Sequence, residues 1–110
     1  LFNCFISIQK RFEDEAKIVI SNAFENYPWL KYCVVVDHDV NIFDPRDVWW
    51  AIGTRSCPER GTILIQDSPG FYRDPFRIHQ SRLGIDATIP LGQWKEFERA
   101  KIPFPQKRSL

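Results

Sequence analysis

The sequence predicts a small α/β domain with a mainly parallel sheet, and three observations support this class. The continuous apolar run from Cys33 to Val36 is typical of a strand that is covered on both faces. Stretches with apolar residues at helical spacing flank this strand, at about 13–26 and 44–55. A further apolar strand follows at 62–66, which completes a β-α-β-α-β order in two or three layers with right-handed crossovers.

The chain opens with a strand at about 2–9, in which apolar and polar residues alternate. Cys4, Ile6 and Ile8 fall on one face, so we expect a strand that is less deeply buried than the run at Cys33. The helix that follows carries three acidic residues in its first turn, which the helix dipole favours. Pro28 ends this helix.

The second helix has a strong start signal. Asp44 is a candidate N-cap, Pro45 stands at the first helical position and Asp47 follows three residues after the cap. Arg55 lies in the last turn, where a cation meets the exposed carbonyl groups. The predicted apolar face consists of Val48, Trp49, Ile52 and, with weaker support, Ala51.

Proline and glycine interrupt every periodic run after residue 66. We therefore expect a long irregular carboxy-terminal segment with one short extended piece near 83–85 and a short helix within 93–100. Residues 101–110 form a basic tail that contains proline. No second domain boundary is visible, so residues 1–110 are predicted to form a single domain.

Composition excludes several classes of function. The net charge of +1, from 15 basic and 14 acidic residues, points to neither nucleic acid nor an anionic membrane surface. Three cysteines cannot all pair, which favours a reduced, cytoplasmic location. We find no apolar run near the roughly 20 residues that span a bilayer, and no signal-peptide pattern. The absence of methionine suggests a fragment or a processed product.

Asp37, His38 and Asp39 stand at the carboxyl end of the central strand, where open α/β sheets place their sites. Consecutive side chains on an extended chain point in different directions, so we expect no metal site here. The two aspartates are instead expected to bind turn amides or to pair with Arg55 or Arg82. We identify no nucleophile with a partner base and no glycine-rich phosphate loop.

Trp49 and Trp50 are consecutive on the predicted helix, so their side chains project about 100° apart and cannot both face one core. We interpret Trp50 as a candidate interface residue. The alternative is a boundary residue that the segment after Asp67 partly covers.

Several of these stretches together resemble one known family. The pattern VVVDxDVxxFDPxxVxWAxxTR, the strand 62–66, the DxPGF turn at 67–71 and the GIDAT run at 84–88 are similar to the carboxy-terminal part of UbiD-type decarboxylases. This resemblance implies an oligomerisation domain whose structural motif includes Asp37, Asp39, Asp44, Arg55 and Asp86.

The resemblance also implies a function for the whole enzyme. A UbiD-like enzyme removes or adds carbon dioxide at an aromatic, heteroaromatic or α,β-unsaturated acid with prenylated FMN. The flavin, its divalent metal and the catalytic residues belong to a preceding domain, so we assign no catalytic residue and no bound cofactor to this chain. The expected partners are that flavin domain and further copies of the enzyme, as a dimer or hexamer.

Phe71, Tyr72 and Arg73 are the residues that the resemblance places at the substrate pocket. Sequence physics alone describes the same segment as a surface turn built on Pro69 and Gly70. Two other functions stay open. One is a free-standing assembly module, or small subunit of a carboxylase, without catalysis of its own. The other is an unrelated α/β protein with a ligand site around Asp37 and Arg73.

Overall fold

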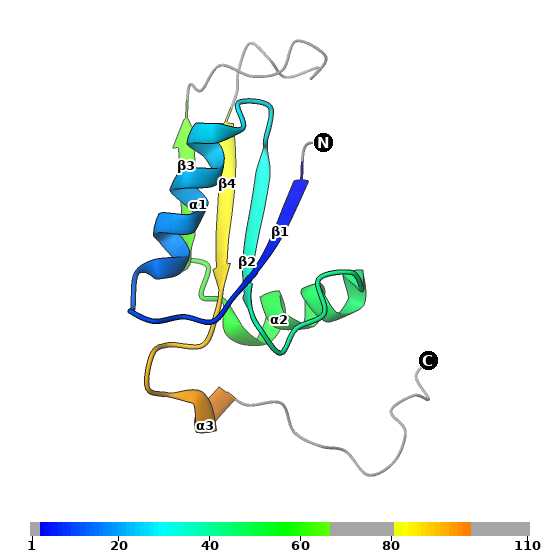
Figure 1. Cartoon of the computed structure of the whole chain (residues 1–110), viewed down its shortest axis with the longest axis vertical. Helices are drawn as coiled ribbons and strands as arrows, with labels where there is room; N and C mark the ends of the chain where they lie inside the picture. The colour runs from blue at the N-terminus through cyan, green and yellow to red at the C-terminus, as the bar shows by residue number, and fades with distance from the viewer. Residues whose placement is uncertain (1–2, 67–80, 98–110) are drawn as a thin grey trace.

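A computed structural model describes residues 3–66 and 81–97 (Figure 1). Within these ranges the chain forms four strands and three helices, which confirms the α/β class. The elements are, in order, β1 (Asn3–Ile8), α1 (Glu15–Asn26), β2 (Tyr32–Asp37), α2 (Pro45–Arg55), β3 (Thr62–Gln66), β4 (Ser81–Ala87) and α3 (Trp94–Phe97). None of the helices in the described part of the chain is long and apolar enough to cross a lipid bilayer.

The strands form one sheet in the order β1-β2-β4-β3, in which β1, β2 and β4 are parallel. A mainly parallel sheet is therefore confirmed, but two details of the prediction were wrong. The strand at 62–66 lies at the edge and runs antiparallel to β4, rather than closing a parallel βαβ unit. The short extended piece expected at 83–85 is the middle of β4, a seven-residue strand between β2 and β3.

The two residues that obscured β4 in the sequence, Arg82 and Gly84, lie on its buried face. Gly84 packs directly under α1, and a Cβ added there would overlap the Cγ2 methyl of Ile20. Arg82 donates hydrogen bonds to the carbonyl oxygens of Phe24, at 2.8 Å, and Pro28. The buried guanidinium of Arg82 thus binds carbonyl groups at the end of α1. It is not the arginine that pairs with Asp37 and Asp39.

Two hydrophobic clusters cover opposite faces of the sheet. Cys33 and Val35 of β2 pack into the first cluster, with buried residues of α1 and the inward side chains of β1. Val34 and Val36 pack into the second cluster, with residues of α2. The alternation along β2 thus produces a three-layer α/β/α arrangement, as its continuous apolar run predicted.

The start of α2 matches the sequence, whereas its apolar face differs in one residue. Asp44 accepts a hydrogen bond from the backbone N–H of Arg46 at 3.0 Å, which confirms the N-cap. Val48 and Ala51 are buried, but Trp49 is 71% exposed and does not belong to the apolar face as expected. Its neighbour Trp50 packs against the second cluster instead, because the helix rotates about 100° per residue.

Candidate functional site

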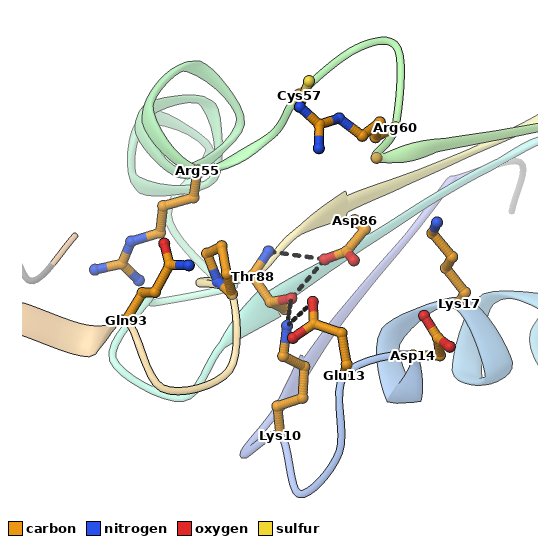
Figure 2. A pocket seen from close by; sticks show the side chains of 12 residues that line it. Lys10, Glu13, Asp14, Lys17, Arg55, Cys57, Arg60, Asp86, Thr88 and Gln93 are labelled. Carbon is orange, nitrogen blue, oxygen red and sulfur yellow. Dashed lines mark hydrogen bonds and ion pairs between the residues drawn. The ribbon is translucent and has the colours of Figure 1, made fainter. Parts of the chain in front are cut away.

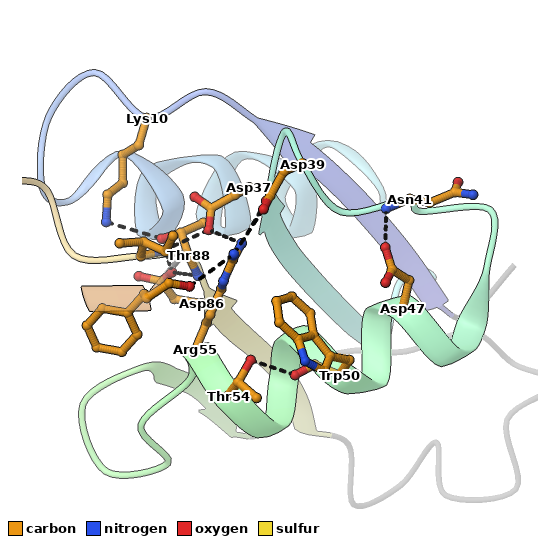
Figure 3. Close-up of polar contacts among 12 residues, drawn as sticks. Lys10, Asp37, Asp39, Asn41, Asp47, Trp50, Thr54, Arg55, Asp86 and Thr88 are labelled. Atoms are coloured by element: carbon orange, nitrogen blue, oxygen red, sulfur yellow. Dashed lines mark hydrogen bonds and ion pairs between the residues drawn. The ribbon is translucent and has the colours of Figure 1, made fainter. Parts of the chain in front are cut away.

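The polar groups of the chain gather where the parallel strands β1, β2 and β4 end. Asp37 is the last residue of β2, Lys10 follows β1 and Thr88 follows β4 directly. Arg55, the last residue of α2, reaches the same edge from the α2 layer (Figure 3). Parallel strands place their carboxyl ends at one edge, so residues far apart in the sequence meet here.

Arg55 joins both aspartates that follow the central strand. Its Nη1 atom lies 3.0 Å from Asp37 Oδ2 and 2.7 Å from Asp39 Oδ1, and its Nη2 atom lies 2.9 Å from Asp39 Oδ2 (Figure 3). The side chains of Arg55 and Asp37 are both buried. Of the partners that the sequence left open for the two acids, Arg55 pairs with both of them, and Asp37 also accepts a hydrogen bond from the backbone N–H of Ile89.

Arg55 also holds the segment after β4. Its Nη2 donates to the carbonyl oxygen of Phe97 at 3.2 Å, and its guanidinium lies over the rings of Trp50 and Trp94 at 4.8 Å and 5.6 Å. The ring of His38 stacks on Trp94. Helix α3 buries none of its own residues, so these contacts connect it to the sheet edge.

The charges of this cluster are set by burial and pairing together. Burial opposes the charge of Arg55, but the hydrogen bonds and charges of Asp39 and Asp37 outweigh it and raise the pKa of the guanidinium. Burial raises the pKa of Asp37 above its ordinary value, although the N–H of Ile89 and the charge of Arg55 act against this. Loss of Arg55 would leave a buried carboxylate without its cation, so the cluster is a structural support.

A second polar chain connects β1 to β4. The side chain of Lys10 is buried, and its Nζ donates to Thr88 Oγ1 at 3.2 Å and lies 3.7 Å from a carboxylate oxygen of Glu13. Thr88 in turn donates its hydroxyl to Asp86 Oδ1 at 2.5 Å and its N–H to the same oxygen at 3.0 Å. Asp86 therefore shapes the turn after β4.

A cavity of about 460 Å³ lies beside these groups, and Figure 2 shows the side chains that line it. Both cations and acids line it in similar numbers, so their charges nearly balance and the lining has no strong preference for an anion. The charged groups that line it, apart from Arg55, are Lys10, Lys17, Arg60, Glu13, Asp14 and Asp86. A second cavity of about 280 Å³ lies next to His38 and Trp94.

The cavity has little catalytic chemistry of its own. Cys57 stands at its rim, exposed, and the backbone N–H groups of Arg60 and Glu59 lower the pKa of its thiol. No histidine is among the described residues that line this cavity, so the thiol has no imidazole base there. Over residues 3–66 and 81–97, no group of three or more His, Cys, Asp or Glu side chains could hold a metal ion.

The structure brings together part of the residue set that the sequence singled out. Asp37, Asp39 and Arg55 form one cluster, whereas Asp44 acts at the other end of α2 and Asp86 acts in the turn after β4. Trp50 lies half-buried over Arg55. The pocket residues Phe71, Tyr72 and Arg73 lie outside the described residues.

Sequence reasoning missed Lys10, Thr88 and Trp94 as members of this edge. Lys10 and Thr88 are 78 residues apart in the chain, and only the pairing of β1 with β2 and of β2 with β4 makes them neighbours. One signal was available. Lys10 and Thr88 each come after a predicted extended segment, and the carboxyl ends of parallel strands lie at the same edge of a sheet.

The chain is similar to one family model and to curated decarboxylases. The model of the 3-octaprenyl-4-hydroxybenzoate carboxy-lyase carboxy-terminal domain matches residues 1–87. The anhydromevalonate phosphate decarboxylase of Methanocaldococcus jannaschii is 42% identical over 103 residues, which are 89% of this chain and 24% of that protein. The chain thus spans about a quarter of the length of the curated relatives it matches.

Solved structures of UbiD-class enzymes share the fold. The enzyme HmfF from Pelotomaculum thermopropionicum, in complex with FMN, matches 90% of this chain and 23% of its own, at 44% identity and a TM-score of 0.83. An evolved dimeric form of HmfF, in complex with prFMN, matches 96% of this chain and 21% of its own, at 42% identity and a TM-score of 0.72. The 3,4-dihydroxybenzoic acid decarboxylase of Enterobacter cloacae matches 89% of this chain and 23% of its own, at 26% identity and a TM-score of 0.82.

Proposed function

Since the chain belongs to the UbiD family, as its carboxy-terminal domain, we propose that it is one part of a decarboxylase whose remaining three-quarters bind prenylated FMN. The match of the family model over residues 1–87 carries this proposal. The relatives are named as decarboxylases, and an HmfF structure contains prFMN. Removal of carbon dioxide would then be a property of the whole enzyme, with the flavin as the group that bonds to the substrate.

The described residues do not fit a flavin or its metal. The cations at the sheet edge are already paired, Arg55 with two aspartates and Lys10 with Glu13 and Thr88. A flavin phosphate needs free donors, such as a glycine-rich loop at a helix start, which this part of the chain lacks. We therefore propose that cofactor, divalent metal and acid-base residues all lie in the preceding domain, and that this chain alone is inactive.

The proposed contribution of this chain to the pocket lies in the segment after β3. There Phe71 and Tyr72 would close the apolar side of the site, and Arg73 would contact a polar substituent of the substrate. The substrate class that we propose is an aromatic, heteroaromatic or α,β-unsaturated carboxylic acid. Relatives named as decarboxylases of 3,4-dihydroxybenzoic acid and of anhydromevalonate phosphate support a carboxylate that carries further polar groups.

We further propose that the enzyme is a homo-oligomer, a dimer or a hexamer. We propose that the contacts between copies involve helix α2, which carries the 71% exposed Trp49 and the half-buried Trp50, or the tail 101–110. Large aromatic side chains are enriched at the centres of interfaces. Because the three cysteines of this chain are free thiols, we propose a reducing compartment, the cytoplasm, for the enzyme.

An assembly subunit without catalysis is the second candidate function. One observation favours it. At the polar edge of the sheet, Arg55 and Lys10 form hydrogen bonds with other residues of the chain, as a structural role requires. The third possibility, a ligand site at Asp37, has less support. Its Oδ2 atom already accepts hydrogen bonds from Arg55 and from the N–H of Ile89.

The test compares the full-length enzyme with this chain in assays of a panel of aromatic and unsaturated acids. Phe71→Ala should lower turnover, and Arg73→Leu should change the relative kcat/KM between acids by about 1 to 3 kcal/mol. Phe43→Ala and Arg46→Leu are controls of the same residue types at exposed positions outside both cavities, and they should leave the profile unchanged. Turnover by the chain alone, or wild-type profiles from both pocket variants, would contradict the proposal.

A further inference from the structure

One face of the sheet carries an apolar strip that neither helix layer covers. The register aligns Tyr32 of β2 with Leu83 of β4, and Leu83 with Leu64 of β3. Phe5 of β1 lies on the same face in the next row, opposite Val34. Tyr32 is 45% exposed, Leu64 57% and Phe5 38%, and Leu83 is half-buried. We call these four residues the apolar strip.

The strip is exposed because α2 covers only half of its face. Helix α2 lies near the end where β2 and β4 finish (Figure 1), and there Val36 and Ala87 are buried beneath it. The apolar strip lies toward the opposite end of the same strands. On the other face, α1 runs along the sheet, and Cys33 and Gly84, one residue beyond the strip, are buried. The asymmetry between the two helices therefore leaves apolar side chains of all four strands uncovered.

We infer that the apolar strip is the docking surface for the preceding part of the same polypeptide, an inference that rests on the proposed function. The matched family model is that of a carboxy-terminal domain, so the remainder of the longer relatives precedes it. Any segment that precedes β1 joins it at Asn3. That residue is aligned with Tyr32 and lies in the same row as Leu83 and Leu64.

The point of attachment therefore places the preceding part next to the strip. Figure 1 shows that β1 starts at this end of the sheet, far from α3. A surface of leucine, phenylalanine and tyrosine matches an apolar partner that offers an acceptor for the phenolic hydroxyl group. The strip has no charged member, which is typical of the centre of an interface.

The small size of the strip favours this occupant over a second copy of the chain. A specific dimer buries roughly 800 Å² on each partner, more than four partly covered side chains offer. A domain on the same polypeptide is held at an effective concentration on the order of millimolar, so a smaller contact suffices to dock it.

The experiment measures thiol accessibility in the full-length protein. Leu64→Cys places a reporter in the strip, and Tyr32→Cys places a second one, in case either substitution impairs folding. Ile18→Cys on α1 is the matched control, because Ile18 is 48% exposed in this structure, close to the values at both reporters. Each variant is treated with iodoacetamide, and peptide mass spectrometry measures the rate at each position apart from the native cysteines.

We expect positions 64 and 32 to react at least about tenfold more slowly than position 18, because a covered thiol is inaccessible to the reagent. Comparable rates at all three positions would overturn the inference. The rates are also measured over a dilution series into the monomeric range. Protection that persists in the monomer supports docking within one polypeptide, whereas protection that disappears assigns the strip to a second copy and overturns it. Decarboxylase activity is assayed on the same samples, so protection without any activity would count against the proposed function alone.

Discussion

Replacement of Gly84 by alanine tests the closest approach between a helix and the sheet. Gly84 lies in β4 under α1, and its added Cβ would overlap Ile20 Cγ2 and lie 3.3 Å from Ile20 Cδ1. Ile20 is fully buried and β-branched, so its side chain has no easy rotation away from the new methyl group. Overpacking of this kind costs about 1 to 3 kcal/mol. Alanine recovers roughly 0.5 to 1 kcal/mol of backbone entropy in a strand, which leaves a net loss of at most about 2.5 kcal/mol and of about 1 kcal/mol from the middle of both ranges.

The assay is urea unfolding followed by tryptophan fluorescence, with Gly53→Ala as the control. Gly53 lies within α2, and nothing lies within 4 Å of an added Cβ, so alanine there should stabilise the helix by up to about 1 kcal/mol. The Ile20→Ala background supplies the decisive comparison. Ile20→Ala removes the methyl group that clashes, so Gly84→Ala should then hardly change the free energy of unfolding. The interaction energy of the double-mutant cycle should be about 1 kcal/mol or more. An equal cost in both backgrounds would refute the packing argument.

Three further predictions concern a cap, two thiols and an ion pair. Asp44→Ala removes the N-cap of α2 and should lower the free energy of unfolding by about 1 kcal/mol in urea titrations; an unchanged midpoint would contradict the cap. Iodoacetamide should modify the exposed Cys57, whose pKa is lowered by backbone N–H groups, well before Cys33, whose pKa burial raises to about 12; equal rates in the folded protein would contradict this order. The hydrogen bond from Arg11 lowers the pKa of the Glu15 carboxyl. The stability that this carboxylate contributes, and that Glu15→Gln removes, should therefore be fully present above the ordinary pKa of about 4.5. It should disappear as the pH falls through the lowered pKa of the folded protein. A difference between wild type and variant that stays constant from pH 7 to acid would exclude this linkage.

The sequence by itself determined the elements whose signals are local. The central strand was predicted because Cys33 to Val36 are all apolar and are buried between two layers, a pattern that needs no knowledge of the partners. The start of α2 was predicted because an N-cap and a proline at the first helical position act within four residues of one another. The pairing of Asp37 and Asp39 with Arg55 was one of the alternatives that the sequence left open, and only 16 to 18 residues separate these groups.

Only the tertiary structure decided the position of β4 and the members of the polar edge. The strand was hidden in the sequence because its buried face carries Gly84 and Arg82 in place of large apolar residues, and both make sense only beneath α1. The meeting of Lys10 with Thr88 likewise depends on the order of three strands rather than on any local pattern. Propensity and periodicity report on neighbours within one or two helical turns. Contacts between residues 78 positions apart form only when the strands pair in a particular order, and that order is a property of the whole chain.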